Sequence, residues 1–264
     1  MTQALDAEET SRLRRARAER IGRWLMPVLT VVAALVIWDR IVVLNQIPHY
    51  ILPGPGLVAQ TLVKDWAILG PATWVTLKIA MMALGVAVIG GVGLAVLFSL
   101  SRWAEMSFYP FAVILQVTPV VAIAPLIFIY IENRTVGLLL CAWIVAFFPI
   151  LSNTSLGLRS VDRNLADLYR IYGASRWQRL IHLQLPSALP YFLGGLRIAG
   201  GLSLIGAVVA EFVSSTTAGG ATGLAWRIIE AGQRLNVPRM FAALALIALA
   251  GIAIFGLLSF ASRL

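Results

Sequence analysis

The chain has 264 residues, of which 59% are apolar and only 12% are charged, with a net charge of +9 at neutral pH. Soluble domains are about 45–50% apolar and about 25% charged, and a chain of this length cannot bury so large an apolar excess in its own core. The composition therefore excludes a soluble enzyme, a disordered protein and a disulfide scaffold. It indicates an integral membrane protein.

Apolar runs long enough to cross a bilayer recur along the chain. A spanning helix needs about 20 mostly apolar residues, and we predict six such helices in a membrane domain over 24–264, behind a basic tail over 1–23. The predicted spans are 24–43, 76–100, 108–130, 136–158, 192–212 and 240–260. Two prolines, Pro119 and Pro125, are expected to bend the third span.

The basic residues predict the orientation of the spans. Thirteen of the 21 lysines and arginines lie in the tail, at Arg102, in the segment 159–191 and at Arg263, whereas five lie in the alternate connecting segments. Because Lys and Arg concentrate on the cytoplasmic side of membrane proteins, both termini are expected in the cytoplasm.

Two segments on the opposite side predict short surface helices. In 44–75 the motif LPGPG precedes LVAQTLVKDWAIL, whose apolar spacing predicts an interfacial helix with Trp66 near its end. In 212–239 a small-residue stretch, VSSTTAGGATG, precedes the amphipathic LAWRIIEAGQRL, which predicts a re-entrant or surface helix.

The segment 159–191 is too long for a simple connection between two spans. Leu165, Leu168, Tyr169 and Tyr172 form one apolar helix face, and Gly173 fits the end of that helix. Ser175 is expected to cap a second helix, which Pro186 should end. The pattern predicts a helix–turn–helix knob that faces the cytoplasm and binds a protein partner.

This loop resembles the EAA loop of permease subunits in bacterial ATP-binding cassette importers. That loop reads E-A-A, three residues, G, nine residues, I, one residue, L-P. Gly173 and Leu185-Pro186 match it, while Asp167 stands at the Glu position and Leu183 at the Ile position. The resemblance assigns contact with the ATPase to eight residues: Asp167, Leu168, Tyr169, Gly173, Ala174, Leu183, Leu185 and Pro186.

The resemblance extends over roughly 45–260. ILPGPGLVAQTL, VTPVVAIAPLIFIYI, FFPILSNTSLGL and LPSALPYFLGGLRIAGGLSLIGAVVAEF are all similar to stretches of the nitrate, sulfonate and taurine branch of these permeases. The chain is thus expected to be an all-α integral protein of the bacterial inner membrane with the six-span, MetI-like permease fold.

The resemblance also implies partners. Two permease copies are expected to form the pathway, two ATP-binding cassette subunits to dock on the coupling loops, and a periplasmic or lipid-anchored binding protein to deliver the substrate. The chain has no Walker motif, so ATP and Mg²⁺ are expected on the partner ATPases, with no cofactor and no enzymatic activity in this chain. The substrate would be a small anion or small polar nutrient: nitrate, a sulfonate, taurine, bicarbonate or a vitamin precursor.

Polar groups within the spans are candidates for the translocation pathway, because such groups are costly in lipid. These candidates are Gln116, Thr118, Pro119, Arg197 and Glu211. The alternatives stay open: the prolines can mark a packed kink, Arg197 can extend to the membrane surface, and Glu211 can hold an outer loop.

No catalytic or metal-binding arrangement is visible in the sequence, because neither histidine has a second ligand at a suitable spacing. The main alternative function is a membrane-anchored structural or redox-complex subunit. That function would require cofactor ligands in the helix bundle, which the sequence does not show.

Overall fold

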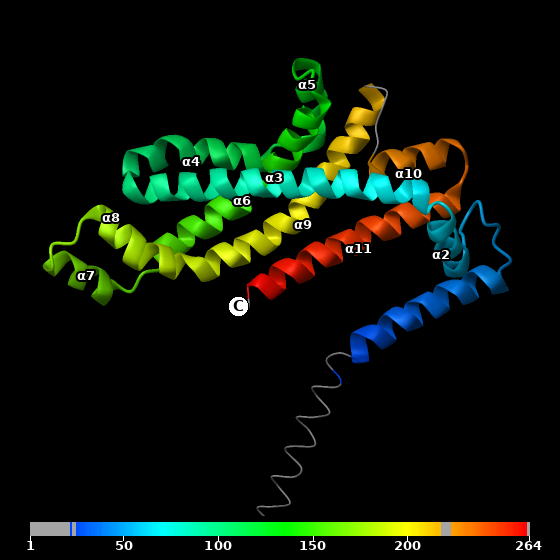
Figure 1. Ribbon diagram of the computed structural model, residues 1–264, viewed down its shortest axis with the longest axis horizontal. Coiled ribbons are helices and arrows are strands. Elements are labelled where there is room, and N and C mark those ends of the chain that lie inside the picture. Colours follow the sequence, from blue (N-terminus) through cyan, green and yellow to red (C-terminus); the bar gives the residue numbers. More distant parts are fainter. Residues whose placement is uncertain (1–21, 23–24, 218–222, 263–264) are drawn as a thin grey trace, which may run out of the picture.

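The computed structural model describes residue 22 and residues 25–217 and 223–262; within these ranges it contains helices and loops but no strand. The predicted all-α class is confirmed (Figure 1). In chain order the helices are Leu25–Leu44, α2 (Pro55–Lys64), α3 (Trp66–Leu100), α4 (Arg102–Val117), α5 (Val120–Tyr130), α6 (Arg134–Arg159), α7 (Arg163–Ile171), α8 (Arg176–Arg179), the π-helical turn η1 (Leu180–Gln184), α9 (Leu185–Thr217), α10 (Leu224–Gln233) and α11 (Val237–Ala261).

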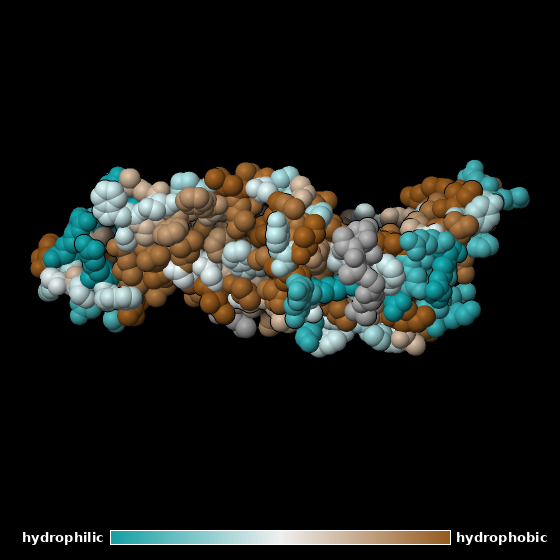
Figure 2. All heavy atoms as spheres, turned by 90° about the horizontal axis from the view of Figure 1, so that it is seen from above, coloured by the Kyte–Doolittle hydropathy of each residue, from teal (hydrophilic) through white to brown (hydrophobic). Residues whose placement is uncertain are grey.

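Five of these elements are long and apolar enough to cross a membrane, and α4 with α5 makes a sixth if the pair is one broken span. The first helix, α6 and α11 lie within three residues of the predicted boundaries. Apolar atoms dominate the middle of the molecule and polar atoms gather toward its two ends (Figure 2). Both observations fit a multi-pass membrane protein.

The second span begins earlier than predicted. α2 ends at Lys64, so Trp66 does not close the short helix but opens α3, ten residues before the predicted start at 76. Asp65 separates the two helices, and its Oδ2 accepts a hydrogen bond from Nε of Arg239 in α11 at 2.6 Å. This long-range ion pair fixes the junction, and the local sequence pattern does not reveal it.

The third span is not one helix. α4 and α5 meet at Thr118 and Pro119 with a bend of 102°. Thr118 has an extended backbone (φ −73°, ψ 121°), as expected for a residue before proline, and Pro119 has no N–H to continue the helical ladder. The bend predicted at Pro119 is present, whereas Pro125 lies inside α5, and the pair starts at Arg102 rather than at 108.

Pro186 does not end a helix, contrary to the prediction. α8, η1 and α9 form one continuous rod that is helical from Arg176 into α9, so the fifth span starts within the coupling segment rather than at 192. In the π turn before Pro186, the N–H of Leu185 reaches the carbonyl of Leu180, five residues back. This widened turn departs from the α-helical ladder where the proline N–H is missing, and it lets the helix continue.

The centre of the bundle is the pair α6 and α9, packed against α3. A Cβ atom added to Gly206 would lie 2.8 Å from Cα of Ala142, and one added to Gly195 would lie 2.7 Å from the carbonyl oxygen of Pro149. The two helices therefore pack backbone to backbone, as small residues permit in membranes.

Candidate functional site

The hairpin α7–α8 projects from one end of the bundle, opposite the end that carries α2 and α10 (Figure 1). Asp162 caps α7, because its side chain accepts hydrogen bonds from the N–H groups of Asn164 (2.7 Å) and Leu165 (3.3 Å). The predicted helix–turn–helix is thus confirmed, with its first helix over Arg163–Ile171.

The turn of the hairpin is fixed by a complete helix stop signal. Gly173 has φ +68°. Its N–H donates to the carbonyl oxygen of Arg170 at 3.0 Å, and the N–H of Ala174 donates to the carbonyl oxygen of Tyr169 at 2.9 Å. This pattern is a Schellman motif. Ser175 then starts α8 in a reciprocal capping box with Gln178. The helix end predicted at Gly173 and the helix cap predicted at Ser175 are both confirmed.

Large apolar side chains cover the tip of the hairpin without burial. Ile171 is 82% exposed and Tyr172 is 81% exposed, with Leu168 and Trp177 also open to solvent. A shallow pocket of about 510 Å³ lies between the two helices, and Tyr169, Gly173 and Ala174 line it. Asp167 is exposed, and its one ion pair with a described residue is to Arg170, at 3.3 Å.

The eight residues assigned to coupling occupy two places. Asp167, Leu168, Tyr169, Gly173 and Ala174 lie together at the tip. The other three lie on the second limb of the hairpin, which runs from Arg176 through α8 and η1 to Pro186. There Leu183 is buried, and Leu185 and Pro186 are exposed.

The base of the hairpin is tied to the turn between α3 and α4. Ser99 Oγ donates to Oε1 of Gln184 at 2.9 Å, and Arg176 Nη1 donates to the carbonyl of Leu100 at 3.5 Å. Arg159, the last residue of α6, forms an ion pair with Glu105 of α4. The hairpin is therefore hydrogen-bonded to the end of α3, and the end of α6, from which the hairpin leaves, is joined to α4.

The candidate pathway residues do not form one cluster. Gln116, Thr118 and Pro119 lie together at the bend between α4 and α5, where Gln116 and Pro119 are exposed. Thr118 Oγ1 donates to the carbonyl of Ile114 at 2.7 Å. An apolar groove of about 420 Å³ reaches Thr118 from α3, α4 and α6.

Arg197 is held against the end of α11. Its Nη2 donates to Oγ of Ser262, and its guanidinium lies 5.9 Å from the ring centre of Phe255, within the range of a cation–π contact. These contacts are those of a residue that joins α9 to α11.

Glu211 is buried, with 2% of its surface exposed. Its Oε2 accepts the N–H of Ala225 at 3.1 Å, and its Oε1 accepts the hydroxyl of Thr76 at 2.8 Å. Thr76 Oγ1 in turn accepts the N–H of Leu224 at 2.9 Å. Two side chains from α9 and α3 thus satisfy the first two N–H groups of α10, which has no side-chain cap of its own.

We call Glu211, Thr76 and the α10 N-terminus the α10 latch. Gly223 is part of it, because a Cβ atom there would lie 2.1 Å from the carboxyl group of Glu211. Thr76 and Gly223 were not identified from the sequence, since they lie 135 and 12 residues from Glu211 and follow no motif.

Glu230 makes the stability of α10 depend on pH. The hydrogen bond from Arg227 Nη1, 2.7 Å long, holds the pKa of Glu230 below its usual 4.5. Because the folded pKa is lowered, the stabilisation is present above pH 4.5 and is lost as the pH falls through the folded value. We expect Glu230→Gln to lower stability by about 0.2–1 kcal/mol at pH 7 and by less at pH 4. Thermal unfolding at the two pH values measures the difference, and an equal loss at both would contradict it.

A metal site does not emerge from the geometry: within the described ranges, no group of three His, Cys, Asp or Glu side chains could hold an ion.

Comparisons with known proteins match this chain to one family. A family model described as "Binding-protein-dependent transport system inner membrane component" matches residues 87–263. A probable ABC transporter permease of Haemophilus influenzae is 36% identical over 84% of this chain and 89% of its own length. The riboflavin transport system permease RibX of Chloroflexus aurantiacus is 35% identical over 94% of this chain and 93% of its own.

More distant relatives, 28–31% identical, are named as permeases for formylaminopyrimidine, aliphatic sulfonates, bicarbonate and taurine. The structure is similar to a solved amino acid ABC transporter crystallised with histidines, with a TM-score of 0.63 at 18% identity. The match covers 77% of this chain and 97% of the other.

Proposed function

The chain belongs to the family of inner-membrane components of binding-protein-dependent transport systems, and from this premise we propose how it couples ATP hydrolysis to transport. It is a multi-pass permease subunit of an ATP-binding cassette importer, not a structural or redox subunit. We propose that its hairpin docks on a cytoplasmic ATPase subunit, with both termini of the chain on that side.

The observation that carries the docking proposal is the apolar tip of the hairpin. Ile171 and Tyr172 are more than 80% exposed on a rigid, doubly capped turn that stands clear of the bilayer-spanning part. Exposed apolar groups on a rigid protrusion are typical of a protein-binding surface. In the proposal they enter a groove of the ATPase, which carries the ATP and Mg²⁺.

The second limb of the hairpin explains how force would reach the membrane. Because α8, η1 and α9 are one rod, a displacement of the tip tilts α9 directly. α9 packs backbone to backbone on α6 at Gly195 and Gly206, and α6 enters the hairpin from the other side. The ATPase would thus move the central helix pair as a unit and switch the pathway between two states.

We propose that two copies of the chain form the pathway, with the bend at Thr118 and Pro119 beside it. Broken helices are tolerated at membrane depth where they are buried in protein or line a cavity, and Gln116 and Pro119 are exposed in the single chain. The contacts of Arg197 and Glu211 favour roles in holding α11 and α10 in place over contact with substrate.

The proposed substrate is a small anion or small polar nutrient that a separate binding protein delivers. The relatives are named for riboflavin, formylaminopyrimidine, aliphatic sulfonates, taurine and bicarbonate. All of these are small and polar.

The first experiment is to tag the chain, purify it from native membranes in mild detergent and count what accompanies it. Two copies with two ATPase subunits are expected. If the chain is purified alone from intact membranes, the coupling proposal is wrong.

A matched pair of variants tests the docking surface. Tyr172→Asp places a charge on the apolar tip and is expected to remove the ATPase subunits from the purified complex, because a buried unpaired charge is costly. Tyr50→Asp is the control, since Tyr50 is also exposed but lies in the outer connection. Retention of the ATPase by Tyr172→Asp would contradict docking at the tip.

A further inference from the structure

A basic cavity lies between the hairpin and the bundle, apart from the docking tip and the bend. It measures about 860 Å³, within the range of about 300–1,000 Å³ typical of small-ligand sites. Its walls come from the end of α3, the first half of α4, the end of α6, α7 and the second limb of the hairpin. Five arginines and one glutamate line it: Arg102, Glu105, Arg159, Arg163, Arg170 and Arg179.

The positive charge in this cavity is only partly compensated. Arg159 pairs with Glu105, and Arg170 pairs with Asp167. The remaining three, Arg102, Arg163 and Arg179, form no ion pair with any described residue. Arg179 Nε is also buried without a hydrogen-bond acceptor among the described residues. A buried donor of this kind is costly unless a ligand supplies the acceptor.

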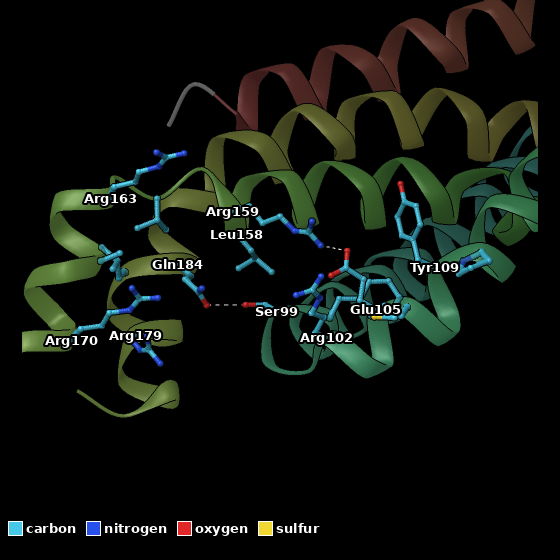
Figure 3. A pocket seen from close by; sticks show the side chains of 16 residues that line it. Ser99, Arg102, Glu105, Tyr109, Leu158, Arg159, Arg163, Arg170, Arg179 and Gln184 are labelled. Carbon is cyan, nitrogen blue, oxygen red and sulfur yellow. Dashed lines mark hydrogen bonds and ion pairs between the residues drawn. The ribbon is translucent and has the colours of Figure 1, made fainter. Parts of the chain in front are cut away.

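The arginines approach the cavity from two directions. In Figure 3, Arg170 and Arg179 come from the hairpin, while Arg102 and Arg159 come from the bundle, with the hydrogen bond between Ser99 and Gln184 between them. Guanidinium groups that face one space repel each other, and a bound anion offsets that repulsion. The planar donor fork of arginine matches the oxygens of a phosphate group.

Beyond Arg102 and Glu105, the wall that α4 contributes is largely apolar, so the cavity suits a ligand with one charged and one apolar part. Met106, Tyr109 and Pro110 line the cavity, and Met106 is 59% exposed. Trp103, 80% exposed in the first turn of α4, is of the type enriched at the membrane–water interface. The arginines suit a phosphate group, and the apolar residues of α4 suit a hydrocarbon chain. A phospholipid offers both, in its headgroup and in the first carbons of its acyl chains.

We propose that this cavity binds a phosphate group, with an anionic phospholipid of the adjacent leaflet as the ligand that fills both its basic and its apolar parts. Basic pockets between helices at the cytoplasmic surface are suited to such headgroups. Only the assignment to the cytoplasmic leaflet rests on the proposed orientation. Binding itself depends on neither docking nor transport.

The test uses the full-length chain in phosphatidylcholine nanodiscs doped with phosphatidylglycerol, which offer the lipid in both leaflets. Native mass spectrometry counts the retained phosphatidylglycerol. Arg179→Gln and Arg163→Gln are each expected to weaken retention by at least about tenfold, because each removes a charge-assisted hydrogen bond to the phosphate. Arg163 is exposed and without a described partner, so its replacement should not affect folding. Arg40→Gln, an exposed arginine of the first helix, is the control for general attraction to anionic lipid.

A second arm identifies the source of the phosphate. Lipid-depleted protein in neutral detergent is titrated with inorganic phosphate, with sodium chloride at matched ionic strength, and its thermal unfolding is followed. Protection by phosphate that Arg179→Gln removes, without selective lipid retention, would keep the anion site and assign it to a soluble phosphate. Equal losses in Arg40→Gln and the cavity variants, or no response in either arm, would overturn the proposal.

Discussion

Replacing Gly173 by valine is expected to abolish substrate uptake while leaving membrane insertion intact. Gly173 has φ +68°, and a β-branched residue in this region costs about 1–2 kcal/mol or more. The chain can avoid that cost by opening the turn, which breaks the hydrogen bonds from Gly173 to Arg170 and from Ala174 to Tyr169. The apolar tip then loses its fixed shape, and coupling should be lost together with ATPase retention.

The control for this variant is Gly173→Asn. Asparagine enters the left-handed region more readily than other side chains, and a Cβ atom at Gly173 meets nothing within 4 Å. Gly173→Asn should therefore retain most uptake, although it adds a side chain at the same place. Uptake and ATPase activity in proteoliposomes measure both variants. Equal activity of the valine and asparagine variants would show that the geometry of this turn does not matter for coupling.

The hairpin could be predicted because its signals are local. The stop at Gly173 and the cap at Ser175 each depend on residues within a few positions, and the apolar face repeats at helical spacing. Both helices of the hairpin follow from these signals without any knowledge of the bundle. The same holds for the first helix, α6 and α11, whose apolar length defines them.

The error at Pro186 arose because the effect of a proline on a helix depends on its neighbours. At Pro119 the chain turns by 102°, whereas at Pro186 it continues as a helix because a π turn precedes it. Both prolines follow an apolar helical stretch, so the sequence does not separate the two cases. The start of α3 was missed for a different reason: Asp65 finds its partner in Arg239, 174 residues away.

Loss of the α10 latch is expected to give the other large effect. Glu211→Ala leaves the N–H of Ala225 buried without its carboxylate acceptor, and it leaves the Thr76 hydroxyl with the carbonyl of Ala72, at 3.3 Å, as its acceptor. An unsatisfied buried group costs about 1–3 kcal/mol, so unfolding should occur at a clearly lower temperature. Gly223→Ala should disturb the same latch, because its methyl group must displace the Glu211 carboxyl group. This overpacking should lower the free energy of unfolding by about 1–3 kcal/mol.

The local readout is amide hydrogen exchange of α10, which should accelerate in both variants while exchange in α7 stays unchanged. Gly256→Ala is the matched control, because a Cβ atom at Gly256 in α11 meets nothing within 4 Å. Since Glu211→Ala and Gly223→Ala break the same contact, the double variant should be little less stable than either single variant. Fully additive losses, or exchange in α10 that does not change, would mean that Glu211 does not hold α10 and would return it to the candidates for the pathway.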